Sequence, residues 1–247
     1  MKINLFPNSI KHSFLMNIKP RSILLCVMLL SLCGCTTVTD IGSSEPLVRE
    51  HIEWCNIWLP YADKDELPRV LIVGDSITVG YYPLVEKQLD GIAYCGRLST
   101  SRCVSDPVFF DELLMVLRQY HFDVVHFNNG LHGFGYTEAS YNNGIVKLFD
   151  ALKENTEDTA LIWANSTPMR EKGNLDKLTE RTERVIQRNK FAREVAMKHN
   201  IPINDLFSAM IDHPEFQGSD GVHFNAKGKE VQAKLVTDII RNNLNKY

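Results

Sequence analysis

The stretch that decides the fold of this chain is Val70-Leu71-Ile72-Val73-Gly74-Asp75-Ser76-Ile77-Thr78. Its continuous apolar run predicts a strand that is covered on both faces of a parallel sheet. A helical pattern follows at once, which places Ser76 in the first turn of a helix, at the carboxyl edge of that sheet. The unpaired N–H groups of such a turn carry partial positive charge and favour a developing alkoxide or oxyanion. Ser76 is therefore a candidate nucleophile, and the alternative is that it only caps the helix.

Apolar strands and amphipathic helices alternate along the rest of the chain. We expect strands at 69–73, 92–95, 123–127, 159–164 and 202–204, and helices at 77–89, 107–120, 137–155, 175–200 and 225–244. This alternation predicts an α/β domain with three layers, α/β/α, around a five-stranded parallel sheet. Ligands of such sheets bind beyond the carboxyl ends of the strands. Ser76, Gly96 and Asn128 each follow directly after an expected strand, so the fold would bring them to one edge.

The composition is that of an ordinary globular protein. The 247 residues are 44% hydrophobic and 23% charged, with a formal net charge of -3. We expect one domain over 49–247, which is long enough to bury a substantial core. The slight acidity gives no support for a nucleic-acid partner. No Cys–His spacing is typical of a zinc site, and no dinucleotide or Walker-type glycine loop appears, so we expect no metal and no cofactor.

Residues 1–35 have the pattern of an export signal. Basic Lys19 and Arg21 precede an apolar segment from Ser22 to Leu32. That segment is too short to span a bilayer comfortably, which favours a signal peptide over a membrane helix. The part before it is unusually long, which leaves open that translation begins at Met16.

The end of this segment, Leu32-Cys33-Gly34-Cys35, resembles the lipobox of bacterial lipoproteins. The resemblance implies cleavage before Cys35 and a lipid on Cys35. The protein would then be exported and anchored at the periplasmic or cell-surface face of a bacterial membrane. The alternatives are a plain cleavable signal peptide and an uncleaved anchor. Residues 36–48 are polar and are interpreted as a tether between the membrane and the domain.

After removal of the signal, Cys55, Cys95 and Cys103 would be the remaining thiols beyond Cys35. If one disulfide forms, Cys95 with Cys103 is the favoured pair, because these two cysteines bracket one loop. Three free buried thiols are an equal alternative, so the sequence leaves the disulfide state open.

A second polar motif, Ser219-Asp220-Gly221-Val222-His223-Phe224-Asn225, lies just before the last expected helix. A serine that transfers acyl groups needs a base to take its proton, and that base needs a carboxylate to fix its tautomer. A short Asp-x-x-His turn supplies both from one segment. Asp220 and His223 alone are a weak signal, because loop histidines exposed to solvent are common. Their combination with Ser76 is much more specific.

Together the two motifs resemble the first and last blocks of the GDSL/SGNH hydrolases. The matching residues are Gly74-Asp75-Ser76-Ile77-Thr78 and Asp220-Gly221-Val222-His223, and the resemblance extends from about Pro68 to the C-terminus in the expected order. It implies a flavodoxin-like domain and ester hydrolysis by a Ser-His-Asp mechanism. By this resemblance Ser76 is the nucleophile, His223 is the general base and acid, and Asp220 is the orienting carboxylate.

The same resemblance implies an oxyanion hole made by the backbone N–H of Ser76, by Gly96 and by Asn128. The stretch Cys95-Gly96-Arg97-Leu98-Ser99 is also similar to the corresponding part of rhamnogalacturonan acetylesterases. The third block departs from the family pattern, because Gly-x-Asn-Asp is replaced by Phe127-Asn128-Asn129-Gly130-Leu131-His132. Asn128, Asn129 and His132 are all candidates for the third donor. We favour Asn128, with Asn129, His132 and Arg97 as substrate contacts.

The sequence thus predicts an exported, lipid-anchored serine esterase. The expected substrate is an O-acyl ester, most simply an acetyl ester on a carbohydrate, in keeping with the nearby Tyr81, Tyr82, Arg97 and Arg102. One alternative is a lipase, thioesterase or lysophospholipase that uses the same three residues. Another is a surface glycan-binding lipoprotein without activity. The acyl length, the particular substrate and the oligomeric state are left open.

Overall fold

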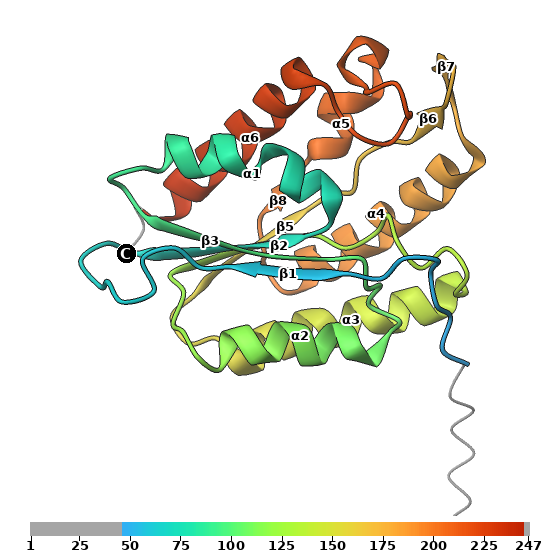
Figure 1. The fold of residues 1–247 in the computed structure, drawn as a ribbon. Coiled ribbons are helices and arrows are strands. Elements are labelled where there is room, and N and C mark those ends of the chain that lie inside the picture. Colours follow the sequence, from blue (N-terminus) through green and yellow to red (C-terminus); the bar gives the residue numbers. More distant parts are fainter. Residues whose placement is uncertain (1–45, 245–247) are drawn as a thin grey trace, which may run out of the picture. The chain divides into compact units, whose positions relative to one another are not determined.

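The computed structural model describes residues 46–244, and a six-stranded sheet with the order β1-β3-β2-β4-β5-β8 lies at its centre (Figure 1). The strands are β1 (Cys55–Trp58), β2 (Arg69–Gly74), β3 (Tyr94–Thr100), β4 (Val124–Phe127), β5 (Ala160–Ala164) and β8 (Ile203–Asn204). All neighbours pair in parallel except β1, which pairs antiparallel with β3. The five parallel strands of the prediction are therefore present, and β1 adds a sixth strand at the edge.

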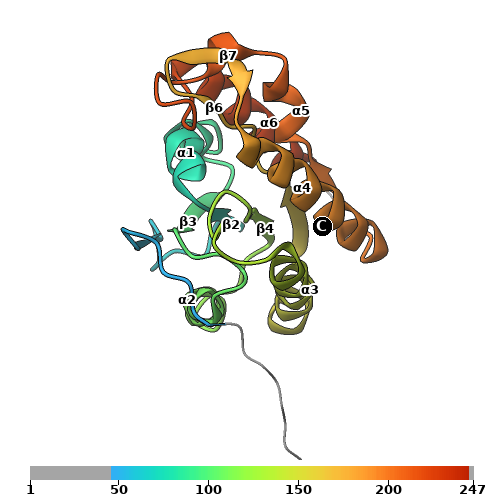
Figure 2. The same cartoon turned by 90° about the vertical axis from the view of Figure 1, so that its right-hand side faces the viewer.

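Helices cover both faces of the sheet, which confirms the predicted three-layer α/β/α architecture (Figure 2). The helices are α1 (Ser76–Gln88), α2 (Pro107–Leu117), α3 (Glu138–Asn155), α4 (Glu180–Lys198), α5 (Leu206–Ile211) and α6 (Ala226–Leu244), with a 3-10 turn η1 (Pro214–Phe216). In Figure 1, α1 and α6 lie above the sheet, and α2 and α3 lie below it. Side chains of α4 join the apolar cluster of α2 and α3.

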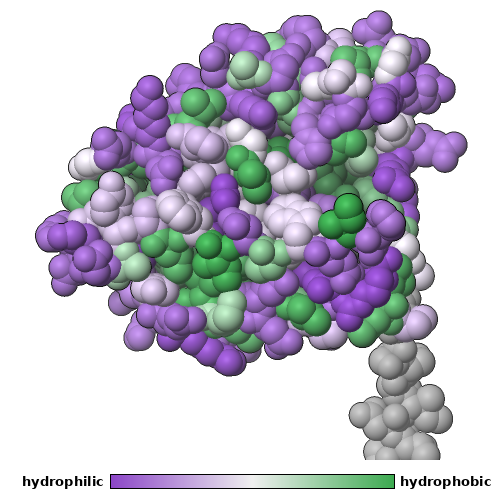
Figure 3. All heavy atoms as spheres, in the orientation of Figure 1, coloured by the Kyte–Doolittle hydropathy of each residue, from purple (hydrophilic) through white to green (hydrophobic). Residues whose placement is uncertain are grey.

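Strand β2 shows why its residues are apolar throughout. Leu71 and Val73 belong to the cluster on the α2–α3 side, whereas Val70 and Ile72 belong to the cluster on the α1–α6 side. Successive side chains of a strand point to opposite faces, so a strand with helices on both sides needs an unbroken apolar run. On the outer face of the domain that Figure 3 shows, by contrast, hydrophilic residues predominate and apolar ones are interspersed among them.

A small hairpin was not predicted. It consists of β6 (Arg170–Glu171) and β7 (Asn174–Leu178), which pair antiparallel. The helix expected at 175–200 begins only at Glu180. The turn between β6 and β7 contains Gly173 with φ +87, a left-handed conformation that glycine adopts without strain.

Of the two alternatives that the sequence left open for the cysteines, the structure has the free thiols: Cys55, Cys95 and Cys103 form no disulfide, and Cys55 is exposed rather than buried. Cys95 belongs to the apolar cluster on the α1–α6 face, whereas Cys103 belongs to the cluster on the other face. The sheet therefore lies between the two thiols, which rules out the Cys95–Cys103 pair that their spacing had favoured.

The predicted signal segment 1–35, its Cys35 and most of the tether 36–48 lie outside the described residues. Within 46–244, no helix is both long enough and apolar enough to cross a membrane.

Candidate active site

Ser76 is the first residue of α1, directly after β2, as predicted. Asp75, and not Ser76, caps the helix: its carboxylate accepts a hydrogen bond of 2.8 Å from the N–H of Ile77. The alternative in which Ser76 only caps the helix is thus wrong, and the hydroxyl of Ser76 remains available for another partner.

That partner is His223, which approaches from a loop 147 residues later in the chain. The Nε2 atom of His223 lies 2.9 Å from Ser76 Oγ, and its Nδ1 atom lies 2.7 Å from Asp220 Oδ2. The side chains of His223 and Asp220 are 48% and 50% exposed. The structure therefore brings the three predicted residues into one hydrogen-bonded row that is open to solvent.

The charge of Asp220 is fixed by its hydrogen bonds. Burial acts to raise the pKa of Asp220, but hydrogen bonds from the His223 ring and from the N–H groups of Val222 and His223 outweigh it and lower the pKa to about 2. An ionised carboxylate at this position accepts a hydrogen bond from the Nδ1–H of the imidazole. The Nε2 atom that faces Ser76 is then the basic nitrogen.

The loop that carries Asp220 and His223 is held in place by the neighbouring hairpin. Gly221 adopts φ +77, and a Cβ atom on it would come within 2.1 Å of the carbonyl oxygen of Arg170. The N–H of Arg170 donates to the carbonyl of Gly221 at 2.7 Å. On the other side, Gln217 Nε2 donates to the carbonyl of Val222 at 2.9 Å. Sequence reasoning missed Arg170 and Gln217, because no local pattern links them to this loop.

Gly96 does not lie at the site. It was expected to follow a short strand, but β3 continues to Thr100, and Gly96 pairs with Leu71 in the middle of the sheet. The edge beside Ser76 is reached only at Ser99, which pairs with Gly74. At about 3.3 Å per residue, Gly96 falls roughly 10 Å short of that edge. The prediction of Gly96 as an oxyanion donor was therefore wrong. The glycine instead leaves room for the side chain of Leu59.

Arg97, the predicted substrate contact, also lies within β3, in register with Ile72. Its guanidinium group stacks 4.8 Å from the ring centre of Tyr82 and donates to Asn56 Oδ1 at 2.6 Å. Arg97 is thus separated from Ser76 along the strand, and its contacts bind the edge strand β1 to the sheet.

Asn128 follows β4 as predicted, but its amide is already engaged. Asn128 Nδ2 donates to the carbonyl of Ala164 at 2.6 Å and to Ser166 Oγ at 3.0 Å. Asn129 is also occupied, because its Nδ2 donates to the carbonyl of Arg102 at 2.8 Å and its Oδ1 accepts from Val104. Both N–H groups of the Asn128 amide are therefore engaged, whereas Asn129 is held at both its Nδ2 and its Oδ1 by the segment 102–104.

His132 differs from the two asparagines. Its Nδ1 atom lies 2.8 Å from Glu50 Oε2, and no hydrogen bond to Nε2 is found among the described residues. The ring of Trp54 packs edge-on at 6.5 Å between centroids. The side chain remains 20% exposed, so His132 can present Nε2 to a ligand.

The loop around His132 is held by a buried arginine that sequence reasoning missed. Arg188 of α4 is fully buried and donates to the carbonyl groups of Gly130 and His132 at 3.0 and 2.8 Å. Its Nε also donates to Glu138 at 2.9 Å. From the sequence, a charged residue in an amphipathic helix is expected to face solvent, so no local signal identified Arg188 as buried.

Two cavities adjoin Ser76 or its helix. One, of about 470 Å³, is lined by Ser76 and His223 together with residues of α1 and α6. The other, of only about 10 Å³, lies beside the start of α1 between Thr78, Asn128 and Ser166.

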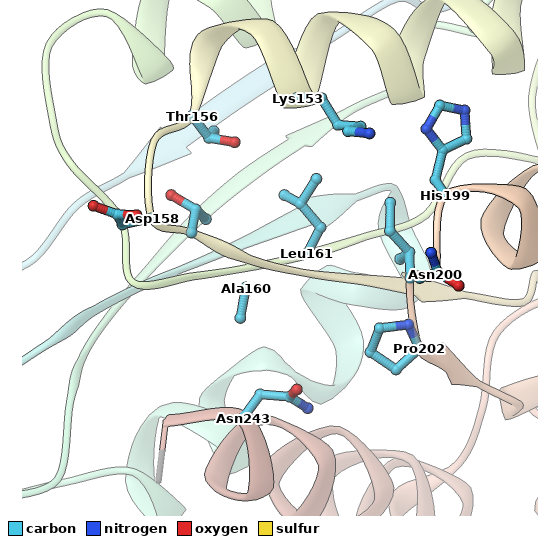
Figure 4. Close-up of a pocket in the computed structure, with 11 residues that line it drawn as sticks. Lys153, Thr156, Asp158, Ala160, Leu161, His199, Asn200, Pro202 and Asn243 are labelled. Atoms are coloured by element: carbon cyan, nitrogen blue, oxygen red, sulfur yellow. The ribbon is translucent and has the colours of Figure 1, made fainter. Parts of the chain in front are cut away.

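Figure 4 shows a third cavity, of about 420 Å³, which is lined by Lys153, Asp158 and Asn200 among others. It lies at the amino end of β5, away from the candidate site. Within 46–244, no group of three or more His, Cys, Asp or Glu residues could hold a metal ion.

Solved structures with this fold include several enzymes. No family model and no curated protein matches the chain. A carbohydrate acetylesterase family member from Sinorhizobium meliloti is 20% identical, with a TM-score of 0.57 over 72% of this chain and 100% of that one. An acetyl xylan esterase is 18% identical, with a TM-score of 0.56 over 70% and 99%. A GDSL-like lipase from Bacteroides thetaiotaomicron is 18% identical, with a TM-score of 0.53 over 70% and 88%. At these identities the likeness establishes the fold.

Proposed function

Because this chain has the fold of solved structures named as GDSL-like lipases and carbohydrate acetylesterases, we propose that it is a serine hydrolase of carboxylic esters. The observation that carries the proposal is the hydrogen-bonded row from Ser76 through His223 to Asp220, with contacts of 2.9 and 2.7 Å. A nucleophile, a base and an orienting carboxylate at these distances are what acyl transfer through a serine requires.

In the proposed reaction, His223 Nε2 takes the hydroxyl proton while Ser76 Oγ attacks the ester carbonyl. Asp220, ionised through its hydrogen bonds, stabilises the imidazolium that forms. His223 then gives the proton to the leaving alcohol, and a covalent acyl-serine remains. A water molecule, activated by the same imidazole, attacks that acyl-enzyme and releases the acid.

The N–H of Ser76, at the positive end of α1, supplies one donor for the oxyanion. Gly96 is too far from the edge and the amide of Asn128 is engaged, so a further donor must come from another group of the loops after β3 and β4. His132, with Nε2 facing no protein partner among the described residues, is the candidate that we favour.

The proposed substrate is an acetyl ester of a carbohydrate. Two of the structures with this fold are named as an acetyl xylan esterase and a carbohydrate acetylesterase. The exposed His223 and Asp220 leave room for a large alcohol part. The alternative, a lipase or thioesterase, is tested with 4-nitrophenyl esters: we expect a higher kcat/KM for the acetate, and a preference for chains of eight carbons or more would contradict acetyl specificity.

Substitution of residues in the hydrogen-bonded row tests whether the protein is a serine hydrolase. Ser76→Ala and His223→Ala should each reduce ester hydrolysis to background, because members of such a unit act together. A fluorophosphonate should label the wild-type protein and not Ser76→Ala. If the wild type binds an acetylated glycan but is never labelled and releases no acetate, the chain is a binding protein and the proposal fails.

We also propose that Cys35 carries a lipid and holds the exported domain to the membrane, on the strength of the Leu32-Cys33-Gly34-Cys35 pattern. Expression in a bacterium fed with a clickable fatty acid tests this. We expect the label in the membrane fraction of the wild type and its loss in Cys35→Ala.

A further inference from the structure

The cavity of about 470 Å³ is lined by two members of the row, Ser76 and His223, and extends beyond them to residues that the proposed reaction does not use. Its walls come from the outer side of α1 and from the beginning of α6, and they include Val79, Gly80, Pro83, Phe224, Lys229 and Gln232. Drug-sized ligands occupy pockets of about 300–1,000 Å³, so this cavity is large enough for one sugar-sized ring.

The chemistry of ester cleavage decides which part of a substrate can lie there. His223 must deliver its proton to the oxygen of the leaving alcohol, so the alcohol lies on the same side of Ser76 as the imidazole. The large cavity contains His223 in its wall. The space on the side of Thr78 and Asn128 amounts to only about 10 Å³. The wide side of the site is therefore the side of the alcohol.

Lys229 gives this cavity a charge. Its ammonium group forms no ion pair with any residue in the described part of the chain, whereas Lys227 and Lys234 on the same helix pair with Glu230 and Asp238. Its stem lies across α1, because a Cβ atom on Gly80 would come 3.2 Å from Lys229 Cε. Glycine inside a helix costs about 0.5–1 kcal/mol relative to alanine. At this position it leaves space for the lysine.

Gln232 adds an unused polar group to the same wall. Its side chain is fully buried, and neither Nε2 nor Oε1 has a hydrogen-bond partner among the described residues. Buried amides are nearly always paired in native proteins, so an unpaired one beside a cavity needs an explanation. A hydroxyl group of a ligand that displaces the flexible Lys229 stem would supply the missing partner.

On the basis of the proposed esterase function, we infer that this cavity binds the alcohol part of the substrate and selects an alcohol that carries an anionic group. The apolar side chains of Val79, Pro83 and Phe224 contact the face of its ring. Lys229 pairs with its carboxylate or another anion, and Gln232 binds a hydroxyl. The substrate class is thus an acetylated acidic sugar rather than a neutral one.

The test uses the full chain and two acetyl esters that differ in charge: 4-acetoxybenzoate and its methyl ester. Lys229→Gln should lower kcat/KM for the anionic ester about five-fold, as expected for a partly exposed ion pair, and should leave the methyl ester within about two-fold. Lys229→Arg, which keeps the positive charge, should retain the wild-type ratio of kcat/KM for the anionic ester to kcat/KM for the methyl ester. The matched control is Lys227→Gln, on the same helix but outside the cavity, which should change neither ester.

The outcomes separate the two proposals. If the wild type and Ser76→Ala release acetate at the same background rate from both esters, the esterase function fails and the inference fails with it. If the wild type hydrolyses both esters but Lys229→Gln lowers both equally, or neither, the enzyme stands and the assignment of the cavity is overturned. The assignment of the cavity would also be overturned if Lys227→Gln lowered kcat/KM for the anionic ester as much as Lys229→Gln does. The loss would then follow from the net charge of the protein and not from a contact in the cavity.

Discussion

Asn128 illustrates how a residue can be in the expected place and yet have another task. Its amide hydrogens are donated to the carbonyl of Ala164 and to Ser166 Oγ, so it joins β4 to the segment after β5. A side chain that is only 9% exposed and bonded in this way stabilises the edge of the sheet.

We therefore expect Asn128→Ala to lower the free energy of unfolding by about 1–3 kcal/mol, because buried acceptors lose their partner. The kcat of the folded protein should fall by less than the roughly 10²–10³-fold that a lost oxyanion donor costs. Urea unfolding and steady-state hydrolysis of 4-nitrophenyl acetate measure the two effects. A hundredfold loss of kcat with unchanged stability would contradict this prediction and would show that Asn128 donates to the oxyanion.

His126, within β4, is a second residue whose chemistry is decided by its surroundings. It lies fully buried in the strand, with Nε2 3.1 Å from Asn204 Nδ2. Burial lowers the pKa of His126 to about 3. The usual value for an exposed histidine is about 6.5, so the unfolded chain takes up a proton in a range where the folded protein does not.

This difference predicts a dependence of stability on pH. The contribution of His126 is fully present above about pH 6.5 and is lost as the pH falls toward 3, at no more than about 1.4 kcal/mol per pH unit. His126→Gln should flatten the decline of unfolding free energy between pH 6 and pH 4, measured by urea titration. The exposed His121→Gln is the control and should leave the decline unchanged. Equal slopes in all three proteins would show that His126 does not titrate on unfolding.

At the scale of elements, the hairpin of β6 and β7 supports the loop of Asp220 and His223. The contact is made by backbone atoms, because Gly221 lies against the carbonyl of Arg170. Arg170 itself is 4% exposed and donates to the carbonyl groups of Leu175 and Ile211. The position of the proposed base thus depends on an element far from it in sequence.

Gly221→Ala should therefore impair catalysis more than folding. The left-handed conformation costs a residue with a Cβ about 1–2 kcal/mol, and the clash with Arg170 would shift His223. A misplacement of about 1 Å can cost about 10²-fold, so we expect a loss of kcat of that order. The control is Gly173→Ala, which has φ +87 but open space around its Cβ and should keep its kcat within about two-fold. Similar kcat values for both variants would contradict a role for the Arg170 contact.

At the scale of the whole molecule, Arg188 joins parts that the sheet alone does not connect. From α4 it donates to the loop after β4 and to Glu138 at the start of α3. Its guanidinium group also lies 4.3 Å from the ring centre of Tyr141. Glu138 would keep its hydrogen bond from Arg184 if Arg188 were removed, but the carbonyl groups that Arg188 binds would lose their donor, at about 1–3 kcal/mol for each group left buried and unpaired.

Arg188→Met should accordingly lower the melting temperature by about 10 °C, at roughly 2–4 °C per kcal/mol for a domain of this size. Arg181→Met is the matched control, since Arg181 lies on the same helix over the ring of Phe134 but is exposed. Differential scanning calorimetry measures both. A shift in Arg181→Met as large as in Arg188→Met would mean that packing on Phe134, and not the buried hydrogen bonds, stabilises this region.

The fold was largely predictable because its signals are local. The apolar run of β2, the alternation of strands and helices, and the change to polar residues at Ser76 depend on residues that are neighbours in the chain. The weaker elements were not predictable in the same way. The strand β1 and the hairpin of β6 and β7 are short, and their residues are mostly exposed, so they carry no apolar pattern.

By itself, the sequence determined the three-layer architecture and the meeting of Ser76 with Asp220 and His223, since residues that follow parallel strands, or precede the last helix, are brought to one edge by the topology. Only the tertiary structure decided which groups are free to act there. The register of β3 removed Gly96 from the edge, and the hydrogen bonds of Asn128 engaged its amide. Register and hydrogen-bond partners depend on competition among residues distant in sequence, and a linear pattern does not record that competition.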